Sequence, residues 1–227
     1  MKIIIEVLRQ KDRNSKPYIQ TFEYETKNEN CTVAEALEDI NTLTLLDVKG
    51  NPVLPIEWQC SCLQKKCGAC AMRINGKPAL ACDTVLTGNK VVLEPLRKFE
   101  TICDLVVDRK PIYESLSQMK VYPDKDITLS DTTNETAQAA SKCLLCGCCL
   151  EICPNYYAGG TFTGMAGFVP IARILNEETN LKLQKEYKKR VYEGCGKSLA
   201  CRNICPAGID IEHLLVKSNR MKRKGGK

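Results

Sequence analysis

Short hydrophobic runs separated by polar turns fill the N-terminal half of the chain. β-Branched and aromatic residues dominate two of these runs and predict β-strands over Lys2–Arg9 and Tyr18–Tyr24. Two further strands are predicted over Ala71–Ile74 and Lys90–Glu94. The polar stretch between the first two runs contains Asn14, Ser15 and Pro17, which predicts a hairpin. Residues 75–78, Asn-Gly-Lys-Pro, predict a turn after the third run.

A helix is predicted between the second and third of these strands. Thr32 is a favourable N-cap residue, and Glu35 stands three positions later, where its carboxylate can reach back as in a capping box. The hydrophobic residues Ala36, Leu37 and Ile40 follow at helical spacing. We therefore expect a small sheet with one helix across it.

Beyond Pro95 the hydrophobic residues recur at helical spacing. Asp104–Lys120 shows this spacing with a break at Pro111, and the polar segment Asp124–Thr136 predicts a loop. Four later segments predict short helices: Glu135–Leu150, Pro170–Asn176, Asn180–Tyr192 and Asp210–Met221. We expect an α+β chain with two domains, residues 1–105 containing the sheet and residues 106–227 containing the helices.

The composition is that of a globular protein with one anomaly. Of the 227 residues, 44% are hydrophobic and 26% are charged, which excludes a disordered chain. We expect no membrane span and no signal peptide, because every apolar run is too short. The anomaly is the 15 cysteines, an odd number in a compartment expected to be reducing, which disfavours disulfides and favours metal binding.

His213 is the single histidine, and this narrows the class of metal site. A Rieske centre and a zinc finger of the two-cysteine, two-histidine type each need two histidines. We expect His213 to be a surface or packing residue of the last helix. The classes left are zinc and iron–sulfur sites whose ligands are all thiolates.

The first cysteine set has the spacing of a plant-type [2Fe–2S] loop. Cys62, Cys67 and Cys70 follow the C-x4-C-x2-C pattern, and Cys82 adds a fourth thiolate from a separate segment. Gly68 leaves room for backbone N–H groups to approach the inorganic sulfides. A four-thiolate zinc site is the alternative, although zinc ribbons favour paired C-x2-C knuckles.

Two further sets form interleaved ferredoxin-type runs, each ending in Cys-Pro. One run is Cys143, Cys146, Cys149 and Cys153; the other is Cys195, Ser198, Cys201 and Cys205. In such runs the cysteine before proline ligates the other cluster. The predicted [4Fe–4S] ligands are therefore Cys143, Cys146, Cys149 and Cys205, and the remaining set is Cys153, Cys195 and Cys201.

Ser198 occupies the position of a missing fourth thiolate. Three thiolates favour a [3Fe–4S] cluster, because an iron without a protein ligand is easily lost. The alternative is a serine alkoxide on a fourth iron, although a hydroxyl loses its proton far less readily than a thiol and soft sites prefer sulfur.

Four cysteines lie outside these sets. We expect Cys31 and Cys103 to be small buried hydrophobes. Cys148 lies within the second run but off its spacing, so it should point away from the [4Fe–4S] cluster. Cys60, two residues before Cys62, is a rival ligand for the first set.

The three motifs in this order resemble the iron–sulfur subunit of succinate dehydrogenase and fumarate reductase. The resemblance spans essentially the whole chain and is most specific in residues 67–82, 143–149 and 201–206. It implies a β-grasp, plant-type ferredoxin-like domain followed by an all-α helical ferredoxin domain. It also implies [2Fe–2S], [4Fe–4S] and [3Fe–4S] cofactors in an electron-transfer subunit with no catalytic residue of its own.

The resemblance further implies partners. These are a flavoprotein subunit with covalent FAD, where succinate and fumarate interconvert, membrane-anchor subunits on the cytoplasmic side of the cell membrane, and a quinone. Electrons would pass from flavin to [2Fe–2S], [4Fe–4S], [3Fe–4S] and the quinone, or in reverse. Tyr157 and Lys217 are expected near the quinone.

One departure from the family pattern concerns the quinone. Ubiquinone-reducing members have a tryptophan shortly after the cysteine that matches Cys153 and a histidine directly after the one that matches Cys195. Here the corresponding residues are Tyr156, Tyr157 and Ala158 in the first segment and Gly196 in the second. These differences favour menaquinone and fumarate reduction.

A second departure concerns the [2Fe–2S] loop. The acidic residue and glycine common between its first two ligands are absent, and Lys65 and Lys66 stand at the end of the loop. Their positive charge is predicted to raise the reduction potential of the cluster slightly.

The formal net charge of +6 equals that of the C-terminal tail. The basic residues there are Lys217, Arg220, Lys222, Arg223, Lys224 and Lys227, with no acid after Glu212. The tail either binds anionic lipid headgroups or is a solvated terminus. Nucleic-acid binding is disfavoured, because no recognition module or aromatic interleaving is present.

Two other functions are weighed against this one. The same electron relay can serve a different reductase, such as a soluble thiol-linked fumarate reductase or a reductase of a related unsaturated acid. A zinc-binding protein without redox activity is the third interpretation, and it would be colourless where an iron–sulfur protein is brown.

Overall fold

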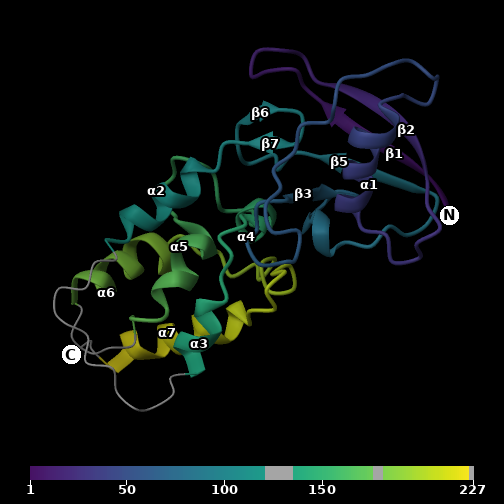
Figure 1. Ribbon diagram of the computed structural model, residues 1–227. Coiled ribbons are helices and arrows are strands. Elements are labelled where there is room, and N and C mark those ends of the chain that lie inside the picture. Colours follow the sequence, from purple (N-terminus) through teal and green to yellow (C-terminus); the bar gives the residue numbers. More distant parts are fainter. Residues whose placement is uncertain (121–134, 176–180, 225–227) are drawn as a thin grey trace. The chain divides into compact units, whose positions relative to one another are not determined.

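The computed structural model of the protein describes residues 1–120, 135–175 and 181–224 (Figure 1). The chain forms two compact units, Met1–Asp108 and Arg109–Lys227. None of the helices built from the described residues is both long and apolar enough to cross a membrane.

A mixed five-stranded sheet forms the first unit. Its strands are β1 (Lys2–Arg9), β2 (Tyr18–Glu25), β3 (Ala71–Ile74), β4 (Lys77–Leu80) and β5 (Lys90–Glu94), in the order β2-β1-β5-β3-β4. β1 runs parallel to β5, and the other neighbours are antiparallel. All four strands expected from the sequence are confirmed, with β2 one residue longer.

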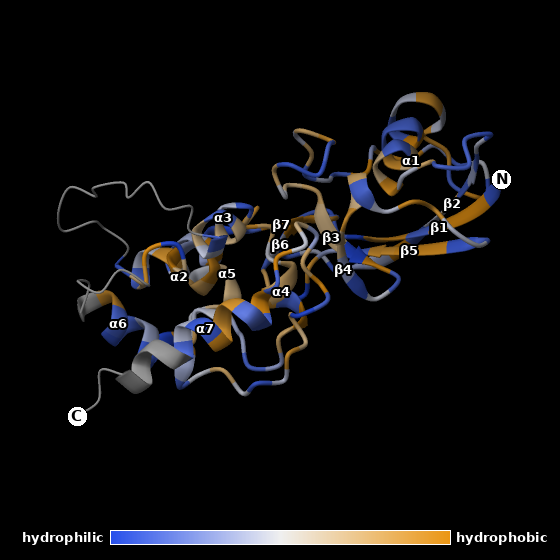
Figure 2. Ribbon diagram, turned by 90° about the horizontal axis from the view of Figure 1, so that it is seen from below, coloured by the Kyte–Doolittle hydropathy of each residue, from blue (hydrophilic) through white to orange (hydrophobic). Residues whose placement is uncertain are grey.

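Alternation along β1 explains why this segment is a strand. Ile3, Ile5 and Val7 are fully buried, while the residues between them are only partly covered. Figure 2 shows hydrophobic residues along β1 and β5, and helix α1 (Val33–Asp39) over one face of the sheet. The core of the first unit lies between that face and α1.

The expected helix begins where the sequence predicts. The Thr32 hydroxyl accepts a hydrogen bond from the Glu35 backbone N–H at 3.1 Å, which is one half of a capping box. The Glu35 carboxylate accepts from the Asn28 side-chain amide at 3.1 and 3.2 Å. After α1 a π-helical turn, Ile40–Thr44, ends at Leu45 with a positive φ of 45°.

Three strands were not expected. β4 begins directly after Asn75 and Gly76, whose φ values of 49° and 78° suit a two-residue hairpin turn. The predicted turn over residues 75–78 was therefore too long. β6 (Thr101–Cys103) and β7 (Val106–Val107) pair around Asp104. β7 lies within Asp104–Lys120, where the pattern predicted helical spacing.

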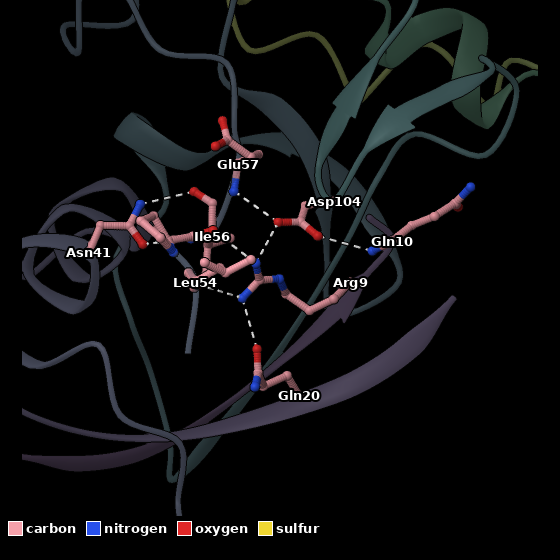
Figure 3. A network of polar contacts seen from close by, with 9 residues as sticks. Arg9, Gln10, Gln20, Asn41, Leu54, Ile56, Glu57 and Asp104 are labelled. Atoms are coloured by element: carbon pink, nitrogen blue, oxygen red, sulfur yellow. Dashed lines mark hydrogen bonds and ion pairs between the residues drawn. The ribbon is translucent and has the colours of Figure 1, made fainter. Parts of the chain in front are cut away.

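A buried ion pair fastens the segment that leads into the first cysteine loop (Figure 3). Arg9 lies 2.9 Å from Asp104, and their side chains are 5% and 4% exposed. Arg9 also donates to the carbonyl oxygens of Leu54 at 3.0 Å and Pro55 at 2.8 Å. Asp104 accepts from the backbone N–H of Glu57 at 3.0 Å. The pair thus joins β1, residues 54–57 and the β6–β7 turn.

The second unit is helical over its described residues. Its helices are α2 (Lys110–Gln118), α3 (Glu135–Ser141), α4 (Cys148–Ile152), α5 (Gly164–Ile171), α6 (Leu181–Tyr187), a π-helical turn (Lys188–Tyr192) and α7 (Ile211–Lys224). α5 is buried along almost its whole length and packs against α2, α3, α4 and α7. Helix α5 therefore forms the centre of this unit.

Several helix boundaries differ from those expected. Pro111 lies in the first turn of α2 and does not break the helix. Proline lacks a backbone N–H, but the N–H groups of a first turn have no partner within the helix. The segment expected over Glu135–Leu150 is two helices separated by a cysteine loop. The helix expected over Pro170–Asn176 instead covers Gly164–Ile171. Most of the loop expected over Asp124–Thr136 lies outside the described residues.

Close packing explains the early start of α5. A Cβ on Gly164 would lie 2.3 Å from the Leu150 side chain, and one on Gly167 would lie 2.6 Å from the Thr163 side chain. Gly164 permits close contact between α4 and α5, and Gly167 leaves room for the Thr163 side chain one turn earlier. They are packing residues, although such a run in a sequence usually indicates a loop.

Candidate iron–sulfur sites

Backbone N–H groups surround the sulfurs of the first cysteine set. Gln64 and Lys66 each donate to the Cys62 sulfur at 3.3 Å, and Lys65 donates to the Cys82 sulfur at 3.3 Å. These N–H groups lower the pKa of Cys62 to about 7, because they stabilise the thiolate. The loop is therefore built to hold negative charge on sulfur.

Left-handed residues give this loop its shape. Leu63, Lys65 and Gly68 have φ values of 51°, 59° and 75°. Alternation between right- and left-handed backbone turns successive N–H groups toward the same side, which forms a concave site for an anion. An iron–sulfur cluster with its thiolates is such an anion, so the loop fits one.

The four predicted ligands of the first site lie together. The sulfurs of Cys70 and Cys82 are 3.4 Å apart, and the Cys67 thiol lies beside the Cys62 sulfur. Burial raises the pKa of Cys70 to about 12, whereas Cys67 is exposed. Cys60 is exposed, and none of the sulfur hydrogen bonds given above involves it.

One of the two lysines of this loop, Lys65, is partly neutralised. Lys65 forms an ion pair with Asp83 at 2.7 Å, and Lys66 donates to the Gln64 side chain at 3.3 Å. Sequence reasoning missed Asp83, which follows Cys82 directly. The effect of Lys65 on a cluster is therefore smaller than that of an unpaired cation.

A cavity in the second unit brings the second cysteine set together. It is lined by Cys143, Cys146, Cys149 and Cys205. The rest of its wall is apolar or backbone: Leu144, Leu145, Gly147, Met165, Ala166, Val169, Pro206, Ala207, Ile209 and Ile211. Four sulfurs facing one water-poor cavity fit a [4Fe–4S] cluster.

Burial dominates the electrostatics of this cavity. It raises the pKa of Cys143 to about 11 and that of Cys149 well above its usual range, with further increases from the neighbouring sulfurs. Cys146 differs: its pKa falls to about 7, because the buried Cys148 thiol hydrogen-bonds to its sulfur and the Arg109 charge stabilises the thiolate. Cys148 does not line the cavity, but its thiol hydrogen-bonds to the sulfur of Cys146, a predicted ligand.

The third cysteine set lies around a loop of the same backbone form. Leu145 and Gly147 flank Cys146 with φ values of 50° and 87°, and Lys197 and Leu199 flank Ser198 with 55° and 53°. Burial raises the pKa of Cys201 to about 11, and the charges of Cys153 and Cys195 raise it further. Cys153 and Cys195 therefore lie near enough to Cys201 for their charges to act on it.

Ser198 replaces a sulfur without changing the course of the loop. Its hydroxyl accepts a hydrogen bond from the Ala200 backbone N–H at 3.5 Å. The corresponding Cys146 lines the cavity of the second site. The donor set here is thus three thiolates and one hydroxyl, which fits a three-iron cluster.

Asn155 occupies the space beside Gly196. A Cβ on Gly196 would lie 2.3 Å from the Asn155 amide nitrogen, and this nitrogen donates to the Gly194 carbonyl at 3.1 Å. Asn155 follows Cys153 and Pro154, whereas Gly194 and Gly196 flank Cys195. The hydrogen bond joins the two segments that carry two of the three thiolates.

The residues expected near a quinone lie on different elements. Tyr157 is 67% exposed and its ring packs over Gly160. Lys217, on α7, donates to the Thr136 hydroxyl on α3. No hydrogen bond or ion pair among the described residues joins Tyr157 to Lys217. His213 is exposed, as expected; side chains from Arg220 onward lie outside the described residues.

Two family models match the chain. A model described as a 2Fe-2S iron-sulfur cluster binding domain matches residues 4–114, and one described as a 4Fe-4S dicluster domain matches residues 138–209. The first contains Cys62, Cys67, Cys70 and Cys82. The second contains all cysteines of the second and third sets.

Similar proteins agree with these matches. The succinate dehydrogenase iron-sulfur subunit of Bacillus subtilis is 32% identical, with 94% of this chain and 90% of that protein covered. An uncharacterised iron-sulfur protein of Methanocaldococcus jannaschii is 32% identical over 96% of this chain, but the match spans only 43% of that longer protein. Other relatives are named as fumarate reductase iron-sulfur subunits.

One solved structure has the same fold over nearly the whole chain. This is a chain of the Mycobacterium smegmatis Sdh1 complex in the apo form, with a TM-score of 0.71 and 21% identity. The match covers 99% of this chain and 97% of that one. The overall architecture is therefore shared with a subunit of that complex.

Proposed function

Because the chain belongs to the family of iron–sulfur subunits of succinate dehydrogenase and fumarate reductase, we propose that it relays electrons between a flavoprotein subunit carrying FAD and a quinone. The observation that carries this proposal is that Cys143, Cys146, Cys149 and Cys205, from two distant segments, line one apolar cavity, while backbone N–H groups of residues 64–66 donate to the Cys62 and Cys82 sulfurs. Bound clusters supply one-electron redox chemistry. The chain itself holds them, orients N–H donors to sulfur and excludes water.

The proposed ligands follow the three sets. Cys62, Cys67, Cys70 and Cys82 hold [2Fe–2S]; Cys143, Cys146, Cys149 and Cys205 hold [4Fe–4S]; Cys153, Cys195 and Cys201 hold [3Fe–4S]. The first set lies in a β-grasp domain, residues 1–105, and the other two in a helical ferredoxin domain, residues 106–227. The sheet of the first unit and the helices of the second support this division.

The proposed complex contains a flavoprotein and membrane-anchor subunits, with this chain on the cytoplasmic side of the membrane. Purification of the native complex, identification of its subunits and assays with succinate and fumarate test this proposal. We expect a FAD-containing subunit, hydrophobic anchors and turnover of both acids. A complex that lacks a flavoprotein would contradict it.

Menaquinone is the proposed quinone. The support is the packing of Asn155 against Gly196, which fills the position where ubiquinone-reducing members carry a histidine side chain. Turnover of the native complex with menaquinol and ubiquinone analogues provides the test, with Tyr157→Phe and Lys217→Gln variants probing the two residues proposed near the quinone. A clear preference for ubiquinone would contradict the proposal.

The Lys65–Asp83 ion pair is expected to influence the reduction potential of the [2Fe–2S] cluster. Replacing Asp83 with asparagine leaves Lys65 unpaired, so the potential should rise, whereas Lys65→Gln should lower it. Partly exposed charges interact by ~0.2–1 kcal/mol. An interaction of this size between either side chain and the cluster corresponds to a shift of about 10–40 mV. The double variant should return close to the wild-type potential. Shifts of the same sign in both single variants would contradict a charge effect.

A second candidate function uses the same relay with a different acceptor. It is favoured by the Methanocaldococcus jannaschii relative, in which the region matching this chain is 43% of a longer iron-sulfur protein, so a similar relay also occurs joined to other sequence. The acceptor would then be a thiol–disulfide couple or a related unsaturated acid. Co-purification with a thiol-dependent reductase in place of hydrophobic anchors would support this candidate.

A further inference from the structure

Arg109 contacts the cysteine loop that forms one wall of the second site. It immediately precedes α2 and is half-buried, and its Nη1 atom donates to the carbonyl oxygen of Cys146 at 2.8 Å. Cys146 lines the cavity, and 37 residues separate it from Arg109 in the sequence. A positive charge is thus held at the backbone of one proposed ligand.

The cavity that Cys146 lines is apolar. The residues that line the cavity include no aspartate, glutamate, lysine or arginine, and Cys146 and Cys205 are set among apolar side chains from α5 and residues 206–211. Electrostatic interactions in such a water-poor site are stronger than at the surface.

We propose that Arg109 tunes the [4Fe–4S] site: its guanidinium, held on the Cys146 carbonyl, stabilises the reduced cluster and raises its reduction potential. The inference rests on the proposed function, because it requires a cluster in this cavity. Reduction adds one electron to an already anionic group, and a nearby cation favours the more negative state. Arg109 contacts no substrate and is a positioning and charge-tuning residue.

Two substitutions separate charge from hydrogen bonding. Arg109→Gln keeps an N–H donor for the Cys146 carbonyl but removes the charge, whereas Arg109→Lys keeps the charge and loses the planar fork. Lys110→Gln is the matched control, because Lys110 is the next residue, is exposed and pairs with Glu114 at 3.6 Å. It removes the same charge one position away.

Redox titration of the native complex, followed by electron paramagnetic resonance, measures the effect. Arg109→Gln should shift the equilibrium about tenfold toward the oxidised cluster, which is about 59 mV for a one-electron couple. Arg109→Lys should retain most of the wild-type potential, and Lys110→Gln should leave it unchanged. A wild-type potential in Arg109→Gln would overturn the inference.

Loss of the [4Fe–4S] cluster from a variant also tests the proposed role of Arg109. If Arg109→Gln lacks the [4Fe–4S] signal while Arg109→Lys keeps it near the wild-type potential, the requirement for charge stands. Loss of the signal in both variants would overturn the tuning role and leave Arg109 as a structural residue. Absence of the signal in the wild-type complex would instead refute the proposed function, so the two failures are distinguishable.

Discussion

Replacing Ser198 with cysteine is expected to convert the third site from a three-iron into a four-iron cluster. The backbone already has the required form, because Lys197 and Leu199 repeat the left-handed conformations of Leu145 and Gly147 around Cys146. The substitution exchanges one oxygen for sulfur at the position where the second site has a ligand. It supplies the missing soft ligand for the fourth iron.

Electron paramagnetic resonance and iron analysis of the purified protein measure this conversion. The signal of the oxidised [3Fe–4S] cluster should disappear from Ser198→Cys, a second reduced [4Fe–4S] signal should appear, and iron content should rise by one atom per chain. The control is Ser198→Ala, which should keep the three-iron signal. A four-iron cluster in the wild type that is lost in Ser198→Ala would contradict this account and assign an alkoxide ligand to Ser198.

Asp104→Ala is expected to cost about 3–5 kcal/mol of stability. Removing Asp104 leaves the buried Arg9 guanidinium without its counter-ion, and an uncompensated buried charge is strongly destabilising. The backbone N–H groups of Gln10 and Glu57 also lose their acceptor.

Urea unfolding of the purified protein, followed by the visible absorbance of the [2Fe–2S] cluster, measures the loss. Because residues 54–57 lead toward Cys62, cluster release should accompany unfolding of the first unit. Arg13→Gln is the matched control: Arg13 pairs with Glu100 at 3.4 Å, but both side chains are at least half exposed. It should cost ~1 kcal/mol or less. Equal midpoints for the two variants would contradict a structural role of the buried pair.

The cysteine spacing could predict which sulfurs gather because the constraint is local. A loop that surrounds a cluster must place its thiolates at fixed intervals, so Cys62, Cys67 and Cys70 are recognisable from sequence alone. The structure also gathers Cys205 with Cys143 across a long separation. That pairing follows from the rule that the cysteine before proline belongs to the other run. The assignment of each sulfur to a cluster stays a prediction.

Groups that act from outside the ligand sets could not be predicted in this way. Arg109 reaches the Cys146 loop only through tertiary packing, and Cys148 contacts Cys146 from behind while lying off the ligand spacing. Asp83 neutralises Lys65 across the loop. Each of these depends on side-chain direction in the folded chain, which hydrophobic periodicity does not encode.

The fold shows the same division between local and tertiary signals. β1 and α1 were predictable, because strict alternation and the Thr32 cap act within a few residues. β4 was missed because its four residues are too few to show the alternation of buried and exposed positions that identifies a strand. The helix that the structure shows as α5 was predicted too late in the sequence. Its glycines pack closely against Leu150 and Thr163, but in a sequence such glycines usually indicate a loop.

Electron paramagnetic resonance of the native protein, combined with iron and zinc analysis, tests the central claim most directly. The account predicts three distinct centres: a [3Fe–4S] signal in the oxidised protein, and [2Fe–2S] and [4Fe–4S] signals after stepwise reduction, with no stoichiometric zinc. A colourless protein that contains zinc and gives no such signals would contradict it.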